Sequence, residues 1–386
     1  MLGSERIRTL SYEGGIREIS ERAASMEKAG RDIVHFEIGQ PDSDSPQNAK
    51  DAAIDALRRG KVAYTPRAGI SELRKALADL EETHGIHSSW EDVVVTCGAV
   101  EALMTVFLAV LDPGDEVLIP TPAFPAYFDQ VRLCSAVPIS VPTAGDPDID
   151  AIEKLVTDRT RLVVLNSPCN PTGHVISPEC NARLFDLAER RGLLLVSDEC
   201  YADFIYEGRH ESIAAIPDAR NRVFVVSSLS KPLSMTGWRI GYVLCPPAFR
   251  SFITKAHQIL TTCACSFAQA GAVTGLSSLK ETTSSMTAEY RERRRLVLDG
   301  LSACDGLKFI PPSGAFYAFP DISALGISSM EFCAELLEKE GVAMVPGDAF
   351  GAPGHVRIAY TTSKERIRDG MIRFVKGWNR LATGRE

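Results

Sequence analysis

Between residues 90 and 245, short apolar runs alternate with segments that have helical periodicity. The apolar runs are DVVVTC, DEVLIP, VPISVP, RLVVLN, LLLVSD, RVFVVSS and RIGYVLC. They are continuous rather than alternating, which is typical of strands buried on both faces of a sheet. Amphipathic segments such as residues 100–111 and 178–192 lie between them. The pattern predicts an α/β fold whose mostly parallel, seven-stranded sheet is covered by helices.

The pattern changes near both ends of the chain. A charged helix is expected over residues 286–301, where the arginine run at 291–295 is expected to be a solvated helix face. The segment GAFYAFP, a helix at 328–341, the strands VAMVPG and HVRIAY and a final helix follow. We therefore expect a large domain of residues 45–285 and a smaller α+β domain formed from residues 1–44 and 286–386.

Composition narrows the possible functions. The chain has 386 residues, of which 45% are hydrophobic and 24% charged, as in a globular protein with a large core. The formal net charge of −8 argues against nucleic acid as a partner. The ten cysteines include no C-x-x-C pair, the N-terminal segment has no apolar signal core, and no run of 18 apolar residues occurs. We expect a cytoplasmic protein with reduced thiols, without a membrane span and without a metal site.

Polar residues follow the predicted strands at their carboxyl ends, where open α/β sheets bind ligands. They are Gly98-Ala99-Val100 before a helix, Phe124 in TPAFPAY, Asn166 and Asn170 in NSPCNPTG, Asp198 and Tyr201, Ser228, Ser230 and Lys231, and Arg239. Taken singly, Lys231 would be a solvated loop lysine, Phe124 a core residue and Asp198 a helix cap. Together they offer an anion cradle, an aromatic ring, a carboxylate, a phenol, an amide, a lysine and an arginine. One ligand uses all of these groups, and it is pyridoxal 5′-phosphate.

The sequence resembles the class I/II aminotransferases of PLP fold type I from FEIGQPDSDSP to HVRIAY. NSPCNPTG and SLSKPLSMTGWRIGY carry the resemblance most specifically, and YTPRAGISELRKAL supports it. The resemblance implies a homodimeric enzyme with shared active sites. It would move the amino group of an L-amino acid to a 2-oxo acid.

The resemblance also implies the roles of residues around the cofactor. Lys231 matches the Schiff-base lysine and proton shuttle, and Asp198 matches the aspartate that keeps the pyridine nitrogen protonated. The pair that hydrogen-bonds the 3′-oxygen would be Asn170 and Tyr201, and the stacking ring would be Phe124. The remaining cofactor-binding residues would be Gly98, Ala99, Val100, Ser228, Ser230 and Arg239, together with Tyr64, which would cross the dimer interface to the neighbour's phosphate.

For the substrate, the resemblance implies that Arg357 clamps the α-carboxylate. The backbone of Gly39 would reach the same carboxylate, and Ile16 would lie in a flap over the substrate. Val100 departs from the family, because many relatives have a hydroxyl, amide or lysine side chain there. In one branch, that lysine helps to hold a distal carboxylate. We therefore expect neutral, apolar or aromatic amino donors.

Two other functions compete with this interpretation. A PLP-dependent lyase that performs β-elimination could use the same lysine and arginine, and the sequence leaves this alternative open. A non-catalytic PLP-binding regulator would need a DNA-binding module ahead of the domain, where about forty residues carry no basic helix-turn-helix. The pair His84 and His87 in HGIH has no third ligand and is expected to lie in a surface loop.

Overall fold

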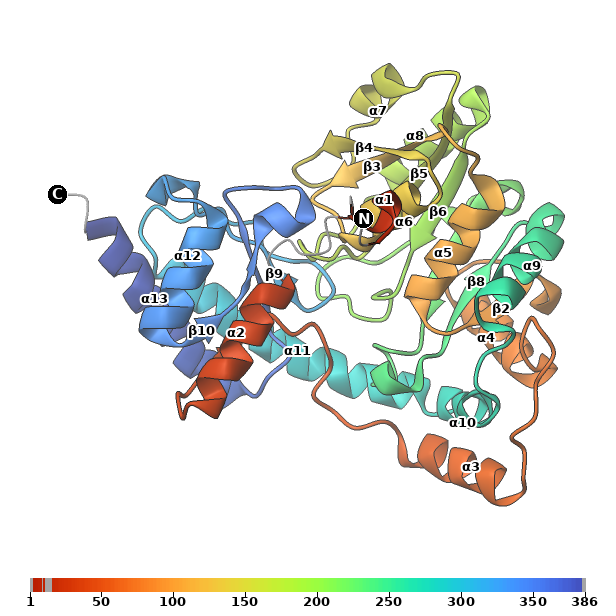
Figure 1. Cartoon of the computed structure of the whole chain (residues 1–386), viewed down its shortest axis with the longest axis horizontal. Coiled ribbons are helices and arrows are strands. Elements are labelled where there is room, and N and C mark those ends of the chain that lie inside the picture. The colour runs from red at the N-terminus through yellow and green to blue at the C-terminus, as the bar shows by residue number, and fades with distance from the viewer. Residues whose placement is uncertain (1–2, 9, 11–15, 384–386) are drawn as a thin grey trace.

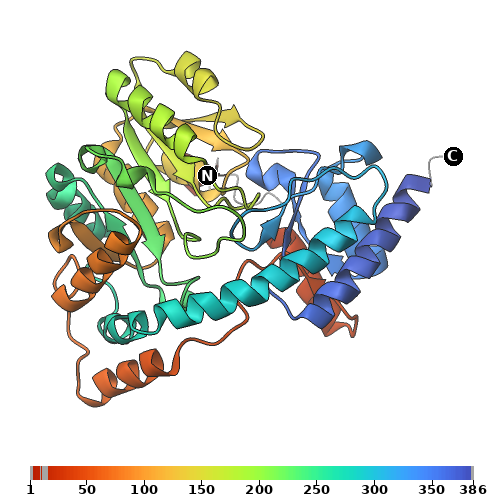
Figure 2. The same ribbon diagram turned by 180° about the vertical axis from the view of Figure 1, so that it is seen from behind.

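The protein consists of a large sheet with its helices and a smaller group of elements beside it (Figure 1). The structure is a computed structural model, and it describes residues 3–8, 10 and 16–383. The long helix α11 (Leu279–Ser302) runs from the first group into the second (Figure 2). No helix in the described ranges combines the length and the apolar character that crossing a membrane requires.

The large sheet has seven strands in the order β2-β8-β7-β6-β5-β3-β4. Their bounds are β2 Val93–Thr96, β3 Glu116–Thr121, β4 Val137–Pro142, β5 Thr160–Asn166, β6 Leu194–Asp198, β7 Val223–Ser228 and β8 Gly241–Leu244. All neighbours are parallel except β8, which is antiparallel to both β2 and β7. This confirms the mostly parallel, seven-stranded sheet.

Burial on both faces explains why these strands are continuous apolar runs. In β2, Val93 and Val95 pack into one hydrophobic cluster and Val94 packs into another on the opposite face, because successive side chains of a strand point to opposite sides. The first cluster includes residues of α4 (Ser71–Thr83), α7 (Ile149–Leu155), α8 (Pro178–Arg191) and α10 (Ser266–Leu276). The second includes residues of α5 (Ala99–Val110), α6 (Ala126–Leu133) and α9 (Arg250–Thr261).

The smaller group contains two short sheets and three further helices. Its strands are β1 Val34–His35, β9 Tyr317–Ala318, β10 Val342–Ala343, β11 Val345–Pro346 and β12 Val356–Ala359, and its helices are α2 Ile16–Lys28, α12 Ser329–Glu335 and α13 Lys364–Thr383. β1 pairs with β10, and β12 lies between β11 and β9. The expected single strand VAMVPG is therefore two strands in different sheets, which separate at Met344.

The arginine run of α11 is only in part the solvated face that we expected, since Arg291 and Arg295 are exposed. Arg293 is only 7% exposed, and its guanidinium donates to both carboxylate oxygens of Asp42 at 2.9 and 2.8 Å. Arg291 and Arg294 donate to the backbone oxygens of Tyr206 and Pro312. These arginines therefore hold α11 against segments of the chain that lie far away in sequence.

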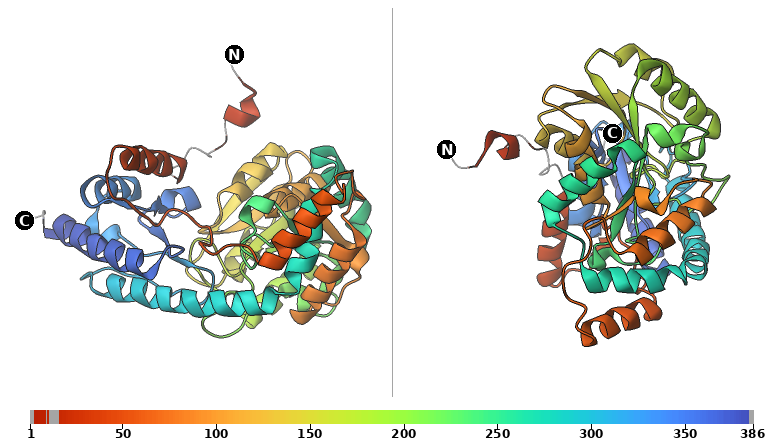
Figure 3. Two further views of the ribbon diagram at one scale, coloured as in Figure 1. Left: turned by 90° about the horizontal axis from the view of Figure 1, so that it is seen from below. Right: turned by 90° about the vertical axis from the view of Figure 1, so that its right-hand side faces the viewer.

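Two helices lie at the edge of the molecule. α3 (Gln47–Arg58) packs against α10. α1 (Glu5–Arg8) contacts α6 and projects from the body of the molecule (Figure 3).

Candidate active site

A cavity of about 750 Å³ lies at the carboxyl ends of β5, β6 and β7, facing the smaller group of elements. It brings together most of the residues predicted from the sequence: Gly39, Ala99, Val100, Phe124, Asn170, Asp198, Tyr201, Ser228, Ser230, Lys231, Arg239 and Arg357. They come from eight separate stretches of the chain, so the fold alone makes them neighbours.

Lys231 lies in the turn after β7 with its amine at the centre of this group. Its Nζ donates to the backbone oxygen of Gly39 at 2.7 Å. Burial lowers the pKa of Lys231 to about 8, and the positive charges of Arg357 and Arg239 act in the same direction. An amine with this pKa can hold or release a proton near neutral pH, as a general base requires.

Asp198 ends β6 on the floor of the cavity. It is 6% exposed, and its carboxylate accepts from the Tyr127 hydroxyl at 2.7 Å and from the Cys200 backbone N–H at 3.2 Å. Burial raises the pKa of Asp198. Among the described residues no cationic side chain forms an ion pair with it, so a protonated ring nitrogen would supply the missing partner.

Arg357 in β12 is a buried cation on the other side of the cavity. It is 4% exposed and lies over the Tyr317 ring at 4.9 Å. Its guanidinium donates to the Glu37 backbone oxygen at 2.6 Å and to Asn170 Oδ1 at 3.2 Å. Its Nε is buried without a hydrogen-bond partner in the described part of the chain. A buried guanidinium with an unused donor fits a carboxylate ligand.

The Asn170 side chain accepts from Arg357 through its oxygen, which leaves its NH₂ group for another acceptor. The Tyr201 hydroxyl lies 2.8 Å from the Tyr317 hydroxyl. Asn170 and Tyr201 both line the cavity that Lys231 enters, and the NH₂ group of Asn170 can donate to a phenolic oxygen there.

An anion cradle closes one end of the cavity. Gly98 is the N-cap of α5 with φ of 88°, and a Cβ there would lie 2.3 Å from Arg239 Nη2. Only glycine allows both this backbone conformation and the close approach of the guanidinium. The free N–H groups that begin α5, the Ser228 hydroxyl and Arg239 fit a phosphate.

Two predicted residues, Gly98 and Tyr64, do not line the cavity, and a third, Ile16, cannot be placed relative to it. Gly98 lies just behind Ala99 and Val100, against Arg239. Tyr64 is 85% exposed on a loop elsewhere on the surface. Ile16 begins α2, but its side chain lies outside the described residues.

Three participants were not predicted from the sequence. They are Tyr127, which donates to Asp198, Tyr317, which contacts Tyr201 and Arg357, and Glu37, whose backbone oxygen anchors Arg357. Tyr127 was detectable, because it lies three residues after Phe124 at the start of α6, where a helical turn brings it to the same side. Nothing local in GAFYAFP marks Tyr317. Within the described ranges, no group of three or more His, Cys, Asp or Glu could hold a metal ion.

Comparison with known proteins agrees with this geometry. Residues 31–373 match the family described as aminotransferase class I and II. The chain belongs to this family. A probable aspartate/prephenate aminotransferase of Aquifex aeolicus is 39% identical over 371 residues, which cover 93% of this chain and 94% of the relative. An aspartate aminotransferase of Pyrococcus horikoshii is also 39% identical over 371 residues. This alignment covers 94% of this chain and 93% of the Pyrococcus protein.

A solved structure supports the same conclusion. The structure of the aspartate aminotransferase of Thermus thermophilus with maleate matches this chain with a TM-score of 0.92 and 37% sequence identity. The match covers 98% of this chain and 100% of the Thermus chain. Class I and II aminotransferases depend on pyridoxal 5′-phosphate, and the polar groups of this cavity fit that cofactor. This chain is therefore a PLP-dependent aminotransferase, and not the β-eliminating lyase that the sequence left open.

Proposed function

We propose that the residues of the cavity divide the work of transamination as follows. Arg357 binds the α-carboxylate of the amino acid through its unused Nε and its Nη groups. Lys231 holds the cofactor covalently, Asp198 keeps a proton on its ring nitrogen, and Asn170 and Tyr201 bind its phenolic oxygen. One observation carries this proposal. The buried carboxylate of Asp198 and the buried guanidinium of Arg357 line one cavity with Lys231, and neither has an ion-pair partner among the described residues.

When bound, the cofactor supplies a ring that takes up the electrons left by removal of the α-proton. Arg357 orients the amino acid so that its α-proton faces Lys231. The amino group of the substrate would first displace Lys231 from the cofactor, which frees the Lys231 amine. This amine would then remove the α-proton, since its lowered pKa leaves a useful fraction neutral. Asp198 stabilises the positive charge on the ring nitrogen, and the surrounding burial strengthens that interaction. The same amine would then deliver the proton to C4′ of the cofactor instead of returning it to the α-carbon, which completes the transfer.

We propose neutral, apolar or aromatic amino donors. The relatives above are named for aspartate and, in one case, prephenate. In this chain, the Lys and Arg side chains that line the described cavity are Lys231, Arg239 and Arg357, and each already has a role. Val100, Leu103 and Phe124 line the same cavity. A second carboxylate would lack a partner within one chain, at a cost of several kcal/mol.

Donor preference is tested by introducing the missing cation. Val100→Lys should raise kcat/KM for aspartate relative to phenylalanine by at least about tenfold, because one charged contact is worth ~1.4 kcal/mol or more. The wild-type enzyme should prefer phenylalanine, methionine or alanine over aspartate and glutamate with one fixed acceptor. Val100→Met is the control, since it adds length without charge. A tenfold preference of the wild-type enzyme for aspartate would contradict the proposal.

We further propose a homodimer with shared active sites. Tyr64 is 85% exposed, and Val62 in the same loop and Ile259 on α9 are 63% and 76% exposed. Thr65 in this loop accepts a hydrogen bond from Gln269 of α10, which follows α9. Apolar side chains exposed this fully, on neighbouring elements, are typical of a surface covered by a partner. A second copy would bring its Tyr64 to the phosphate cradle.

Mixing two inactive variants tests the shared site. Tyr64→Ala and Lys231→Ala homodimers should each be nearly inactive, and their heterodimers should regain part of the activity. One site of the heterodimer then carries both substitutions and the other carries neither. Subunit exchange is followed by mass spectrometry of differently tagged chains. Complete exchange without recovered activity would show that Tyr64 acts within its own subunit or not at all.

We also propose the division into residues 45–285 and residues 1–44 with 286–386, and a cytoplasmic location. The seven-stranded sheet lies within the first range, and the two short sheets lie outside it. The ten cysteines are all free thiols, as in a reducing compartment.

A further inference from the structure

A buried histidine–glutamate pair lies directly behind the cofactor cavity. His210 Nε2 and Glu199 Oε2 are 3.0 Å apart, and their side chains are 5% and 2% exposed. Glu199 follows Asp198 at the end of β6, but its side chain points away from the cavity, whose lining it does not join. The mechanism above uses neither residue, although burying two ionisable groups is costly unless the arrangement serves a purpose.

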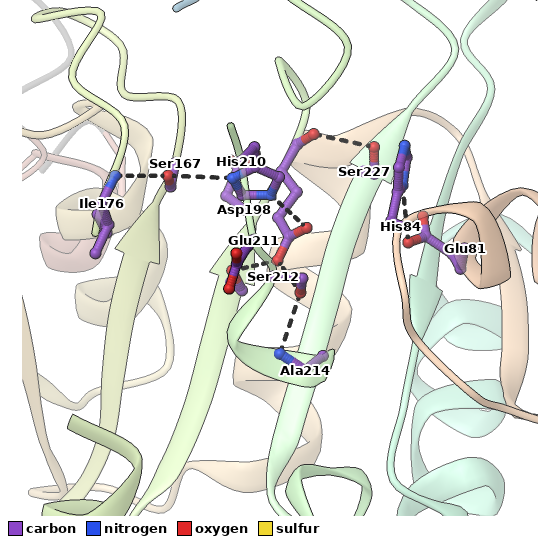
Figure 4. Close-up of polar contacts among 12 residues, drawn as sticks. Glu81, His84, Ser167, Ile176, Asp198, His210, Glu211, Ser212, Ala214 and Ser227 are labelled. Carbon is purple, nitrogen blue, oxygen red and sulfur yellow. Dashed lines mark hydrogen bonds and ion pairs between the residues drawn. The ribbon is translucent and has the colours of Figure 1, made fainter. Parts of the chain in front are cut away.

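The pair joins three separate segments around Asp198. Glu199 Oε1 accepts from Ser197 at 2.7 Å and from Ser212 at 2.6 Å. His210 Nδ1 lies 3.4 Å from the hydroxyl of Ser167, which accepts from the Ile176 backbone at 3.0 Å. Figure 4 shows His210 between Ser167 and the region of Ser212. The network thus spans the end of β6, the loop at 210–214 and the turn that begins at Ser167.

That turn carries the residue proposed to bind the cofactor's phenolic oxygen. Asn170 N–H donates to Asn166 Oδ1 at 2.7 Å, and the Asn166 side chain donates to the Asp198 backbone oxygen at 3.0 Å. Ser167 N–H donates to the same oxygen at 3.1 Å. Asp198 and Asn170, which would bind two different polar atoms of one cofactor, are therefore fixed relative to each other by a framework that His210 contacts from behind.

Charge gives the pair a second consequence. Burial acts to raise the pKa of Glu199, but His210 and the Ser212 and Ser197 hydroxyls outweigh it and lower the pKa. Glu199 therefore remains an anion next to Asp198, and its charge in turn helps to raise the pKa of Asp198. Without a compensating charge, two adjacent buried carboxylates would compete for protons.

The other ionisable groups behind the cavity lie farther along the same layer. Glu81 pairs with His84 at 3.4 Å, and the resulting pKa of His84 is about 9, although burial opposes this. Burial raises the pKa of Asp203, and the proximity of His84 and, to a smaller extent, of His210 opposes this rise. Figure 4 places His84 beside Glu81 and away from His210. His210 is thus the histidine that contacts Glu199, whereas His84 contacts Glu81, which lies farther from Asp198.

We propose that His210 is a positioning residue for the transamination site: it neutralises Glu199, so that Asp198 acts as a single anion, and it braces the turn that carries Asn170. This inference rests on the role proposed for Asp198. It predicts that replacing His210 changes the electrostatics felt by the bound cofactor, whereas a purely structural pair would change only the stability of the fold.

The test is a spectroscopic pH titration of the holoenzyme variants. In His210→Gln, the excess negative charge of Glu199 should raise the pKa of the absorbance change of the bound cofactor by about one pH unit. Glu199→Gln removes a negative charge and should lower the same pKa. The double variant Glu199→Gln/His210→Gln replaces both members of the pair and keeps polar side chains. It should bring the pKa of the absorbance change back to within about 0.3 pH units of the wild-type value.

His174→Gln is the matched control. His174 pairs with Asp146 at 2.8 Å, also near the turn at 166–173 but without contact to Asp198. The cofactor titration of His174→Gln should therefore match that of the wild-type enzyme. Thermal unfolding of each variant separates folding defects from electrostatic ones. A shift in His210→Gln that the double variant reverses supports the proposal. Unchanged titration in His210→Gln, or an equal shift in His174→Gln, overturns it.

The outcome is distinguishable from a failure of the proposed site. If borohydride reduction of the wild-type holoenzyme labels a lysine other than Lys231, the proposed function of the cavity fails. If Lys231 is labelled and the wild-type enzyme transaminates, but His210→Gln binds and titrates the cofactor as the wild type does, only the inference about His210 fails.

Discussion

Lys231→Ala should lower kcat for transamination by at least about 10⁴-fold, which corresponds to ~5.5 kcal/mol of lost transition-state stabilisation. The loss is large because one amine both takes the α-proton and delivers it to C4′ of the cofactor, and alanine can do neither. The cofactor should still bind, since Asp198, Asn170, Tyr201 and the cradle at α5 remain. Single-turnover absorbance measurements, which separate cofactor binding from proton transfer, provide the readout.

A lysine outside the cavity serves as the control for this variant. Lys280→Ala changes an exposed side chain of α11 and should leave kcat unchanged. Borohydride reduction followed by peptide mapping should place the cofactor on the peptide that holds Lys231. Residual activity of Lys231→Ala within tenfold of the wild type would exclude Lys231 as the proton carrier.

Asp198→Asn should lower kcat/KM by about 10²- to 10³-fold, because a buried neutral amide cannot stabilise a proton on the cofactor's ring nitrogen. Asparagine has the same shape and can still accept from the Cys200 N–H, so the fold should persist. The pH dependence gives a second readout. The wild-type contribution of Asp198 requires its ionised form, so activity should fall as the pH approaches the raised pKa of this carboxyl from above.

A cofactor analogue with a permanent positive charge distinguishes charge from packing. An N-methylated ring needs no carboxylate to keep its charge. The activity of Asp198→Asn should therefore be at least about tenfold higher with this analogue than with the normal cofactor. Asp186→Asn, an exposed change on α8, is the control for general effects of the substitution. If Asp198→Asn lost activity only through unfolding, its melting temperature would fall and the analogue would restore nothing.

The strands could be predicted because their signals are local, and the signal for the lysine proposed to attach the cofactor is local as well. Continuous apolar runs identified the strands of the large sheet, since each strand is buried on both faces. The positions of Asn170, Asp198 and Lys231 directly after such runs placed them at one edge of the sheet, because the carboxyl ends of parallel strands meet there. The resemblance then added their chemical roles and Arg357.

The partners of these residues depended on contacts that no local pattern encodes. Arg357 and Asn170 are 187 positions apart, and Tyr201 and Tyr317 are 116 apart, yet each pair is joined by a hydrogen bond. Arg293 lies in a run of charges that reads as solvated, and is buried because α11 passes Asp42. Periodicity states which face of an element is apolar, but not which distant element covers it.

The sequence by itself determined the type of fold and the cofactor, and it predicted the residues proposed to carry the chemistry, because these depend on periodicity and on motifs within a few residues. The tertiary structure decided how those residues are held and charged. Burial lowers the pKa of Lys231, leaves Asp198 and Arg357 without partners of opposite charge among the described residues, and sets His210 against Glu199. These properties arise from desolvation and from long-range packing, which exist only once the chain is folded.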